Sequence, residues 1–379
     1  MARVGMTEPL YEQIYKHILA EIESGDLQSG ERVPSEKELA DQYHVSRITS
    51  KRALQILEQQ GFIDRARGKG SFVAKNIAIG KSREPGALNS FEEQRMAAFI
   101  MPDFADSFGS RLLRSIETNM RLNNAAMLFR RTGGNLDEEA RAIDVFLSAG
   151  VDGLIVFPVH GEFYNERLLR MVLDRFPLVL VDRYLKGISA CSISVDNHRA
   201  AQDLTEYLIR LGHTQIAFVS PPVQGTSTIE ERMQGVTNSL AAHGLPFGAE
   251  DCLTDLYSTL PNAFILENIQ KDEETIRKFL SAHPQLTAFV VCEYNLALVL
   301  EQVLNRLGHQ VPKDFSIVCF DSVEDAINGP HFTHICQDES FMGQKAVELL
   351  LAQINGQEVP LQTIVPYTLN EGLSSGPLY

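Results

Sequence analysis

The chain has 379 residues, of which 22% are charged, and its formal net charge is −15. This length predicts two or three domains with sizeable cores. No N-terminal apolar run resembles a signal peptide, and no stretch approaches the ~18 apolar residues that a membrane helix needs, so we expect a cytoplasmic protein.

The first part of the chain predicts three helices. A helix from about Pro9 to Glu23 carries apolar residues at a four-residue spacing, namely Leu10, Ile14, Ile18 and Ile22. A second helix opens at Ser35, which together with Glu38 fits a capping box. A third helix starts at Ser46, after a tight turn, and stops at Gly61. A glycine-punctuated hairpin follows, so the whole pattern is that of a winged helix-turn-helix.

Charge supports a DNA-binding role for this segment. In helix-turn-helix proteins the N-terminal end of the last helix enters the major groove, where basic side chains meet phosphates and base edges. Glu58 and Asp64 are the acidic residues between His44 and Lys75, against seven basic residues: Arg47, Lys51, Arg52, Arg65, Arg67, Lys69 and Lys75. Most acidic residues therefore lie in the rest of the chain, whose negative charge should repel a DNA duplex.

The segment from about residue 9 to 75 resembles the GntR-type winged helix at nearly every signature position, including Pro34-Ser35-Glu36, Val45-Ser46-Arg47 and the glycine-rich stretch that ends at Val73. This resemblance implies helix contacts to DNA by Lys37, Ser46, Arg47, Thr49 and Lys51, and wing-tip contacts by Arg67, Gly68 and Lys69. Ser35 and Glu36 are further candidates, although both could serve only to cap their helix. Arg52 is also a candidate, with a solvated position on the helix flank as the alternative.

Residues 76–95 change character, because glycine, proline, serine and asparagine interrupt any periodicity. They are predicted to form a linker. We therefore expect a DNA-binding domain at 1–75, a linker at 76–95 and a larger domain at 96–379.

From Met96 onward, short apolar runs alternate with amphipathic helical stretches. This pattern predicts an α/β fold with parallel sheets covered on both faces. The length allows two such lobes, and a cleft between lobes is a usual place for a small molecule.

Several motifs in this part resemble the sensor domain of LacI/GalR regulators, which has the fold of type I periplasmic sugar-binding proteins. They include VDRYLKG at 181–187, ISVDNHRAA at 193–201, ERMQG at 231–235 and LGHQVPKDFSIVCFD at 307–321. The resemblance covers about residues 96–372. A GntR-type winged helix joined to such a sensor is similar to the arabinose-repressor subfamily of Gram-positive bacteria.

The resemblance implies an effector pocket at the carboxyl ends of the strands. Its candidate residues are Phe104, Asp106, Ser107, Phe108, Asp182, Arg183, Tyr184, Arg232, Glu293, Tyr294, Asp321 and Gln337. Arginine and aspartate side chains suit hydroxyl groups, and an aromatic ring can stack on a sugar. Glu293 and Tyr294 depart from the family, which has Asn-Asp there. Arg232 could instead form an ion pair between the lobes, and Tyr184 could lie on a subunit surface.

No catalytic or metal-binding motif stands out. The five cysteines lack zinc-ligand spacing, which predicts buried free thiols, and there is no GxSxG, P-loop or HExxH motif. We expect no enzyme activity, no catalytic residue, no metal and no cofactor.

These patterns together predict a homodimeric transcription repressor of a sugar-utilisation operon. It would bind a near-palindromic operator and be released by a small sugar, for which the family favours L-arabinose. The alternatives are a regulator that answers a nucleoside, a phosphosugar or another small ligand, including one that acts as a corepressor. A structural DNA-bridging protein is a third possibility, and it would leave the pocket residues without a task.

Overall fold

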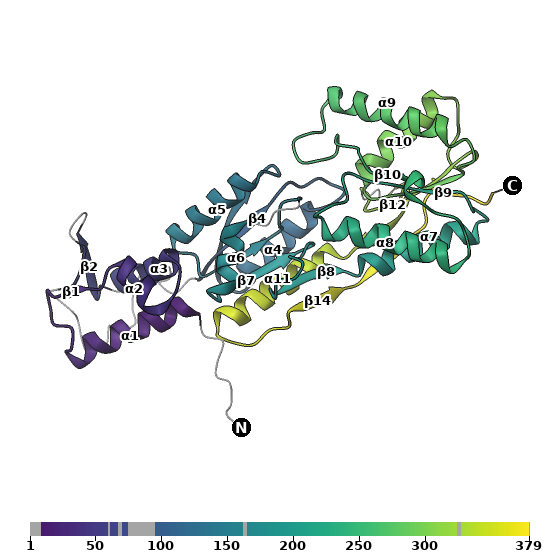
Figure 1. Ribbon diagram of the computed structural model, residues 1–379. Helices are drawn as coiled ribbons and strands as arrows, with labels where there is room; N and C mark the ends of the chain where they lie inside the picture. The colour runs from purple at the N-terminus through teal and green to yellow at the C-terminus, as the bar shows by residue number, and fades with distance from the viewer. Residues whose placement is uncertain are drawn as a thin grey trace.

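The computed structural model describes residues 9–59, 61–66, 70–74, 95–161, 165–323 and 327–378. Figure 1 shows an elongated molecule in which the winged helix lies at one end and two α/β lobes follow in a row. The predicted class, a winged helix-turn-helix joined to a two-lobed domain with parallel sheets, is confirmed.

The winged helix is built as its sequence predicts. Its elements are α1 (Leu10–Ser24), β1 (Arg32–Val33), α2 (Glu36–Tyr43), α3 (Arg47–Gln59), β2 (Ile63–Ala66) and β3 (Gly70–Val73), and the strands form a small antiparallel sheet. The capping box is present, because the Glu38 amide donates to Ser35 Oγ (3.3 Å) and the Ser35 amide donates to Glu38 Oε2 (2.7 Å). His44 adopts a left-handed conformation with φ of 54° and makes the turn that aims α3.

The N-terminal lobe consists of six parallel strands in the order β14-β8-β7-β6-β4-β5. The strands are β4 (Arg95–Met101), β5 (Ala125–Arg131), β6 (Gly153–Val156), β7 (Leu178–Val181), β8 (Ser192–Val195) and β14 (Gln362–Val365). Four helices belong to this lobe: α4 (Ser110–Leu122), α5 (Leu136–Ala149), α6 (Glu166–Leu173) and α11 (Glu339–Ile354).

The C-terminal lobe repeats this arrangement with the strand order β10-β9-β11-β12-β13-β15, in which β15 pairs antiparallel. The strands are β9 (Ile216–Val219), β10 (Cys252–Leu253), β11 (Ala288–Val291), β12 (Ser316–Phe320), β13 (Thr333–Gln337) and β15 (Tyr367–Asn370). The helices are α7 (Asn197–Arg210), α8 (Ser227–Ala242), a short 3₁₀ helix η1 (Ala249–Asp251), α9 (Leu266–Ala282) and α10 (Tyr294–Arg306).

The chain crosses between the lobes three times, from β8 to α7, from β13 to α11 and from β14 to β15. Two of these crossings start a helix with an aspartate cap. Asp196 accepts from the Arg199 amide at 2.8 Å, and Asp338 accepts from the Phe341 amide at 2.9 Å. The crossings form the hinge beside which the carboxyl ends of the strands meet.

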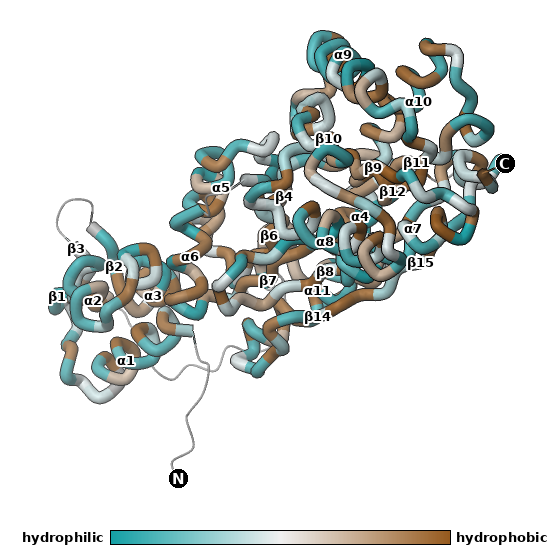
Figure 2. The backbone as a smooth tube through the Cα atoms, turned by 45° about the vertical axis from the view of Figure 1, so that its right-hand side comes forward, coloured by the Kyte–Doolittle hydropathy of each residue, from teal (hydrophilic) through white to brown (hydrophobic). Residues whose placement is uncertain are grey.

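The core strands are almost wholly apolar because helices cover both faces of each sheet. In Figure 2 the strands β9 and β12 are mostly brown, whereas α7 and α9 show mixed brown and teal. The five cysteines are free thiols; Cys191, Cys292 and Cys319 are buried, and Cys252 and Cys336 are half-buried.

Candidate functional site

The exposed side of the winged helix carries several of the predicted DNA contacts. Lys37 and Arg47 are exposed, Lys51 is half-buried, and Ser46 Oγ accepts from the Thr49 amide at 3.2 Å, as an N-cap does. Their contact with DNA stays a prediction. The wing-tip candidates Arg67, Gly68 and Lys69 lie outside the described residues.

The other DNA candidates have partners within the protein. Ser35 caps α2, and Glu36 forms an ion pair with Arg65 of the wing. Thr49 and Arg52 face the N-terminal lobe, where Thr49 Oγ1 donates to Asp174 and Arg52 Nη2 donates to Asp152 Oδ1. A contact with DNA by Thr49 or Arg52 would therefore require that the winged helix leave this position.

A cavity of about 350 Å³ lies between the lobes. Most of the predicted effector residues line it: Phe104, Ser107, Phe108, Asp182, Arg183, Arg232, Glu293, Tyr294, Asp321 and Gln337. Asp106 and Tyr184 are not among the lining residues. Asp106 is exposed to solvent, and the Tyr184 hydroxyl donates to Glu231 at 2.6 Å.

Arg232 of α8 is held firmly in the C-terminal wall of the cavity. Its Nε donates to Asn197 Oδ1 (2.8 Å), its Nη1 donates to the Cys292 carbonyl (2.6 Å), and its guanidinium lies 3.7 Å above the centre of the Phe320 ring. A guanidinium fixed by these contacts is oriented before a ligand arrives, so little rotamer entropy is lost on binding.

Two aspartates occupy equivalent places in the two lobes. Asp182 follows β7 and Asp321 follows β12, the fourth strand of each sheet in chain order, and both residues have a φ of 64°. This left-handed conformation is unfavourable for most side chains but tolerated by aspartate, and it commonly occurs at binding sites. It turns each carboxylate from the strand end into the cavity.

Burial changes the acidity of the cavity carboxyl groups. Desolvation raises the pKa of Asp321 to about 7, although Arg232 and the hydrogen bond from Gln337 oppose the shift. It likewise raises the pKa of Glu293 to about 7. The pKa of Asp182 is also raised by burial, against the attraction of Arg183. Burial in the cavity therefore shifts all three carboxyl groups towards their neutral forms.

Phenylalanines form the N-terminal wall of the cavity. The rings of Phe108 and Phe157 meet edge to face with centroids 6.1 Å apart, and Arg183 lies 4.8 Å over the Phe157 ring. Phe104 remains 41% exposed and stands against Phe129 at 6.2 Å. An exposed ring at the edge of a polar cavity is suited to stack on the apolar face of a sugar or base.

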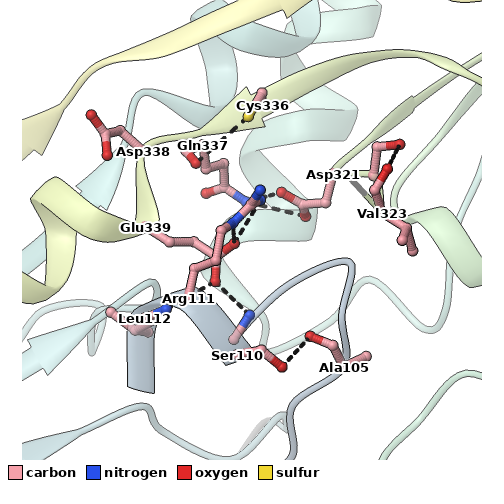
Figure 3. Close-up of polar contacts among 12 residues, drawn as sticks. Ala105, Ser110, Arg111, Leu112, Asp321, Val323, Cys336, Gln337, Asp338 and Glu339 are labelled. Carbon is pink, nitrogen blue, oxygen red and sulfur yellow. Dashed lines mark hydrogen bonds and ion pairs between the residues drawn. The ribbon is translucent and has the colours of Figure 1, made fainter. Parts of the chain in front are cut away.

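Figure 3 shows how the hinge fixes the residues at the base of the cavity. Gln337 Nε2 donates to both oxygens of Asp321, at 2.9 and 3.2 Å. Two residues further along, the buried Glu339 accepts from Arg111 Nε at 2.8 Å and from the Gly109 amide at 2.7 Å. Glu339 thus anchors the end of the loop that carries Phe104 and Phe108. The pair of Arg111 and Glu339 was not predicted, and its one signal in the sequence is a glutamate two residues after Gln337.

Further lining residues come from segments that carried no motif, notably His160, Thr259 and Asn262. Asn262 Nδ2 donates to the Gly133 carbonyl (3.2 Å), and Thr226 lies 2.5 Å from His160 Nδ1, so both pairs bridge the lobes. Burial lowers the pKa of His160 to about 4, which keeps this bridge uncharged at neutral pH. A Cβ atom at Gly133 would collide with Asn262, so the close approach there depends on glycine.

The cavity combines hydrogen-bond donors and acceptors with aromatic rings, and this combination suits a small polyhydroxylated ring. Within the described ranges, no group of three or more histidine, cysteine or carboxylate side chains is placed to hold a metal ion. The helices of the described part include none long and apolar enough to cross a membrane.

Comparison with known proteins agrees with this architecture. Residues 10–73 match the model of bacterial regulatory proteins of the gntR family, and residues 205–375 match that of a periplasmic binding protein-like domain. The chain is 28% identical over 362 residues to the arabinose metabolism transcriptional repressor of Geobacillus stearothermophilus, covering 93% of each protein. It is 25% identical to the repressor of the same name from Halalkalibacterium halodurans, covering 92% of this chain and 90% of that protein.

The fold has close counterparts among solved structures. The crystal structure of transcription regulator CcpA of Lactococcus lactis superposes with a TM-score of 0.64 at 20% identity, covering 74% of this chain and 99% of that one. The dimeric Lac repressor gives 0.63 at 19% identity, covering 75% and 100%. The chain is a transcription regulator and not an enzyme, and it joins a DNA-binding domain of the gntR family to a periplasmic binding protein-like domain.

Proposed function

We propose that this regulator represses a sugar-utilisation operon and that a small neutral sugar, with L-arabinose as the leading candidate, releases it from its operator. The observation that carries the proposal is the interlobe cavity, in which arginine, carboxyl and amide groups face phenylalanine rings. The two similar repressors are named for arabinose metabolism, which supports the choice of sugar. The working form is a cytoplasmic homodimer whose two winged helices bind the halves of an operator.

The charged side chains that line the cavity favour a neutral ligand over a phosphosugar. The cavity presents two arginines, Arg183 and Arg232, together with the four carboxyl groups of Asp103, Asp182, Glu293 and Asp321. A phosphate brought next to these carboxyl groups would be repelled by them, or would hold them in their protonated form. A sugar hydroxyl can donate to a carboxylate and accept from an arginine in the same place.

Calorimetric titration of the full-length protein tests the ligand. L-Arabinose is expected to bind and to weaken binding to operator DNA, because a ligand shifts an equilibrium only through its different affinity for the two states. Ribose, glucose, a nucleoside and a phosphosugar serve as comparisons. Binding of the phosphosugar alone would refute the neutral-sugar proposal while leaving the regulator intact.

Arg47→Ala tests the DNA face. Arg47 is exposed at the first turn of α3, so its loss should weaken operator binding by about 10-fold or more while leaving calorimetric sugar affinity unchanged. Arg210→Ala, which removes an exposed positive charge from the far lobe, is the matched control. Equal operator affinity in the two variants would remove Arg47 from the DNA interface.

A further inference from the structure

The recognition helix α3 does not face solvent all round. Thr49 and Arg52 are 8% and 4% exposed, because the N-terminal lobe covers them. Thr49 Oγ1 donates to Asp174, and Arg52 Nη2 donates to Asp152 Oδ1 at 2.8 Å. The same helix adds a third contact, from Gln55 Nε2 to the Ser148 carbonyl at 3.1 Å.

Apolar side chains continue this contact. The Tyr11 ring of α1 lies 6.1 Å from the Phe176 ring of the lobe, and both residues are buried. The Arg52 guanidinium is 5.8 Å from the centre of the Tyr11 ring. One cluster of buried apolar residues thus runs from the core of the winged helix into the lobe. The two units are docked through both an apolar and a polar contact.

The lobe side of the contact is formed where α5 and α6 end. Asp152 follows the end of α5, and its second oxygen accepts from the Met96 amide at 2.9 Å, which fixes it to β4. Asp174 is the C-cap of α6, where the helix dipole is unfavourable to an anion. A donor such as the Thr49 hydroxyl relieves that cost. The two carboxylates thus accept hydrogen bonds from two side chains of α3.

Some hydrogen-bonding groups at this contact lack a partner, as expected of a contact that opens. Arg52 Nε and Nη1 and Gln55 Oε1 are buried without a hydrogen-bond partner among the described residues. Unmet hydrogen bonds of this kind destabilise the docked state where water does not supply them. Release into solvent would satisfy all three atoms, which offsets part of the loss of the ion pair and of apolar burial.

We propose that the surface formed by the C-terminal ends of α5 and α6, with Asp152 and Asp174, is a docking site for the recognition helix of the same chain, and that docking there competes with DNA. Contact of α3 with DNA is part of the proposed function, so the proposed competition rests on that function. Thr49 cannot contact the lobe and a base pair at once. The apparent affinity for DNA is therefore reduced by the fraction of molecules that are docked.

The docking site is connected to the cavity by α5. This helix follows Gly133 and Gly134, which touch the Asn262–Pro261 loop of the other lobe, and it ends at the docking site. Its 14 residues span about 21 Å as one rigid element. The α5 helix thus joins the cavity rim to the surface that holds α3.

The test compares a double variant, Asp152→Asn with Asp174→Asn, with the parent full-length protein. The duplex is one selected from a randomised pool with the parent protein. Asparagine keeps an oxygen for the Met96 amide, so folding should be retained. We expect the double variant to bind the duplex at least about threefold more tightly. A control variant, Asp137→Asn with Glu117→Gln, removes two exposed charges elsewhere on the same lobe and should change affinity less.

Hydroxyl-radical footprinting gives a second readout that needs no variant. Tyr11 and Phe176 should be protected in the free parent, and both should become more reactive when the duplex binds. Unchanged protection of both rings in the duplex-bound parent, or an affinity gain no larger than that of the control variant with Asp137→Asn and Glu117→Gln, would overturn the docking proposal. Failure to select any duplex would instead refute the proposed function, while increased reactivity of the rings in the double variant would still support docking.

Discussion

The two lobes share one strand order, yet they present different chemistry to the cavity between them. The N-terminal lobe contributes the rings of Phe104, Phe108 and Phe157 beside Asp182 and Arg183, whereas the C-terminal lobe contributes the Tyr294 ring beside Arg232, Glu293, Asp321 and Gln337. Asp182 and Asp321, which end equivalent strands with the same φ, are the feature that the lobes have in common. Phenylalanine rings are thus more numerous in the N-terminal wall of the cavity, and hydrogen-bonding side chains are more numerous in the C-terminal wall.

Among tests of this difference between the lobes, Arg232→Ala is expected to have the largest effect. Because Arg232 is buried and oriented by Asn197 and Cys292, its loss should weaken sugar binding by about 100-fold, which corresponds to about 3 kcal/mol. Calorimetry measures the change, and operator binding should persist without responding to the sugar. Arg199→Ala on the exposed side of α7 is the control. An unaltered sugar affinity would show that the C-terminal wall does not bind the hydroxyl groups.

A smaller effect is expected of Asp321→Asn on the stability of the ligand-free protein. The folded-state pKa of Asp321 is raised to about 7, so the folded protein holds a proton that the unfolded chain releases at lower pH. Its contribution to stability is present below the unfolded pKa and is lost as pH rises through about 7. The parent should therefore unfold at a lower temperature at pH 8 than at pH 6.

Asparagine cannot ionise and tolerates the left-handed conformation, so Asp321→Asn should flatten this dependence and stabilise the protein at pH 8 by roughly 1–3 kcal/mol. Thermal unfolding at several pH values measures the difference. Asp255→Asn, an exposed aspartate of the same lobe, is the matched control. If both variants follow the parent curve, Asp321 is ionised in the empty cavity.

The mildest effect concerns the aromatic wall. Phe104→Ala should weaken sugar binding by about fivefold, because a partly exposed ring contributes about 1 kcal/mol when it stacks. Phe104→Tyr keeps the ring and should retain affinity in the same calorimetric titration. Equal affinities for the alanine and tyrosine variants would mean that the ligand does not touch Phe104.

The sequence predicted those parts of the site that follow from regular structure. Asp182 and Asp321 stand after apolar strands, and parallel strands bring their carboxyl ends together. Thr259 and Asn262 were missed because they lie in an irregular segment without periodicity, and only the tertiary fold brings it over the cavity. Asp106 and Tyr184 neighbour true lining residues, but side chains next to each other on a loop point in different directions.

In the winged helix, too, features set by neighbouring residues were predicted, whereas contacts between residues far apart in the sequence were not. Its helix starts and its capping box follow from short-range signals, such as the pair of Ser35 and Glu38. The docking of Arg52 on Asp152 joins residues 100 positions apart, and no local pattern records such a contact.

The three crossings between the lobes also bear on how this chain tolerates genetic change. Because α11 and β14 belong to the N-terminal lobe but follow the C-terminal lobe in the chain, a premature stop codon after Gln337 would strip a helix and an edge strand from the lobe that was synthesised first. Neither lobe is encoded by one uninterrupted stretch of the gene. Recombination between related regulators should therefore exchange the two-lobed domain as a whole, with viable junctions concentrated near its border with the winged helix.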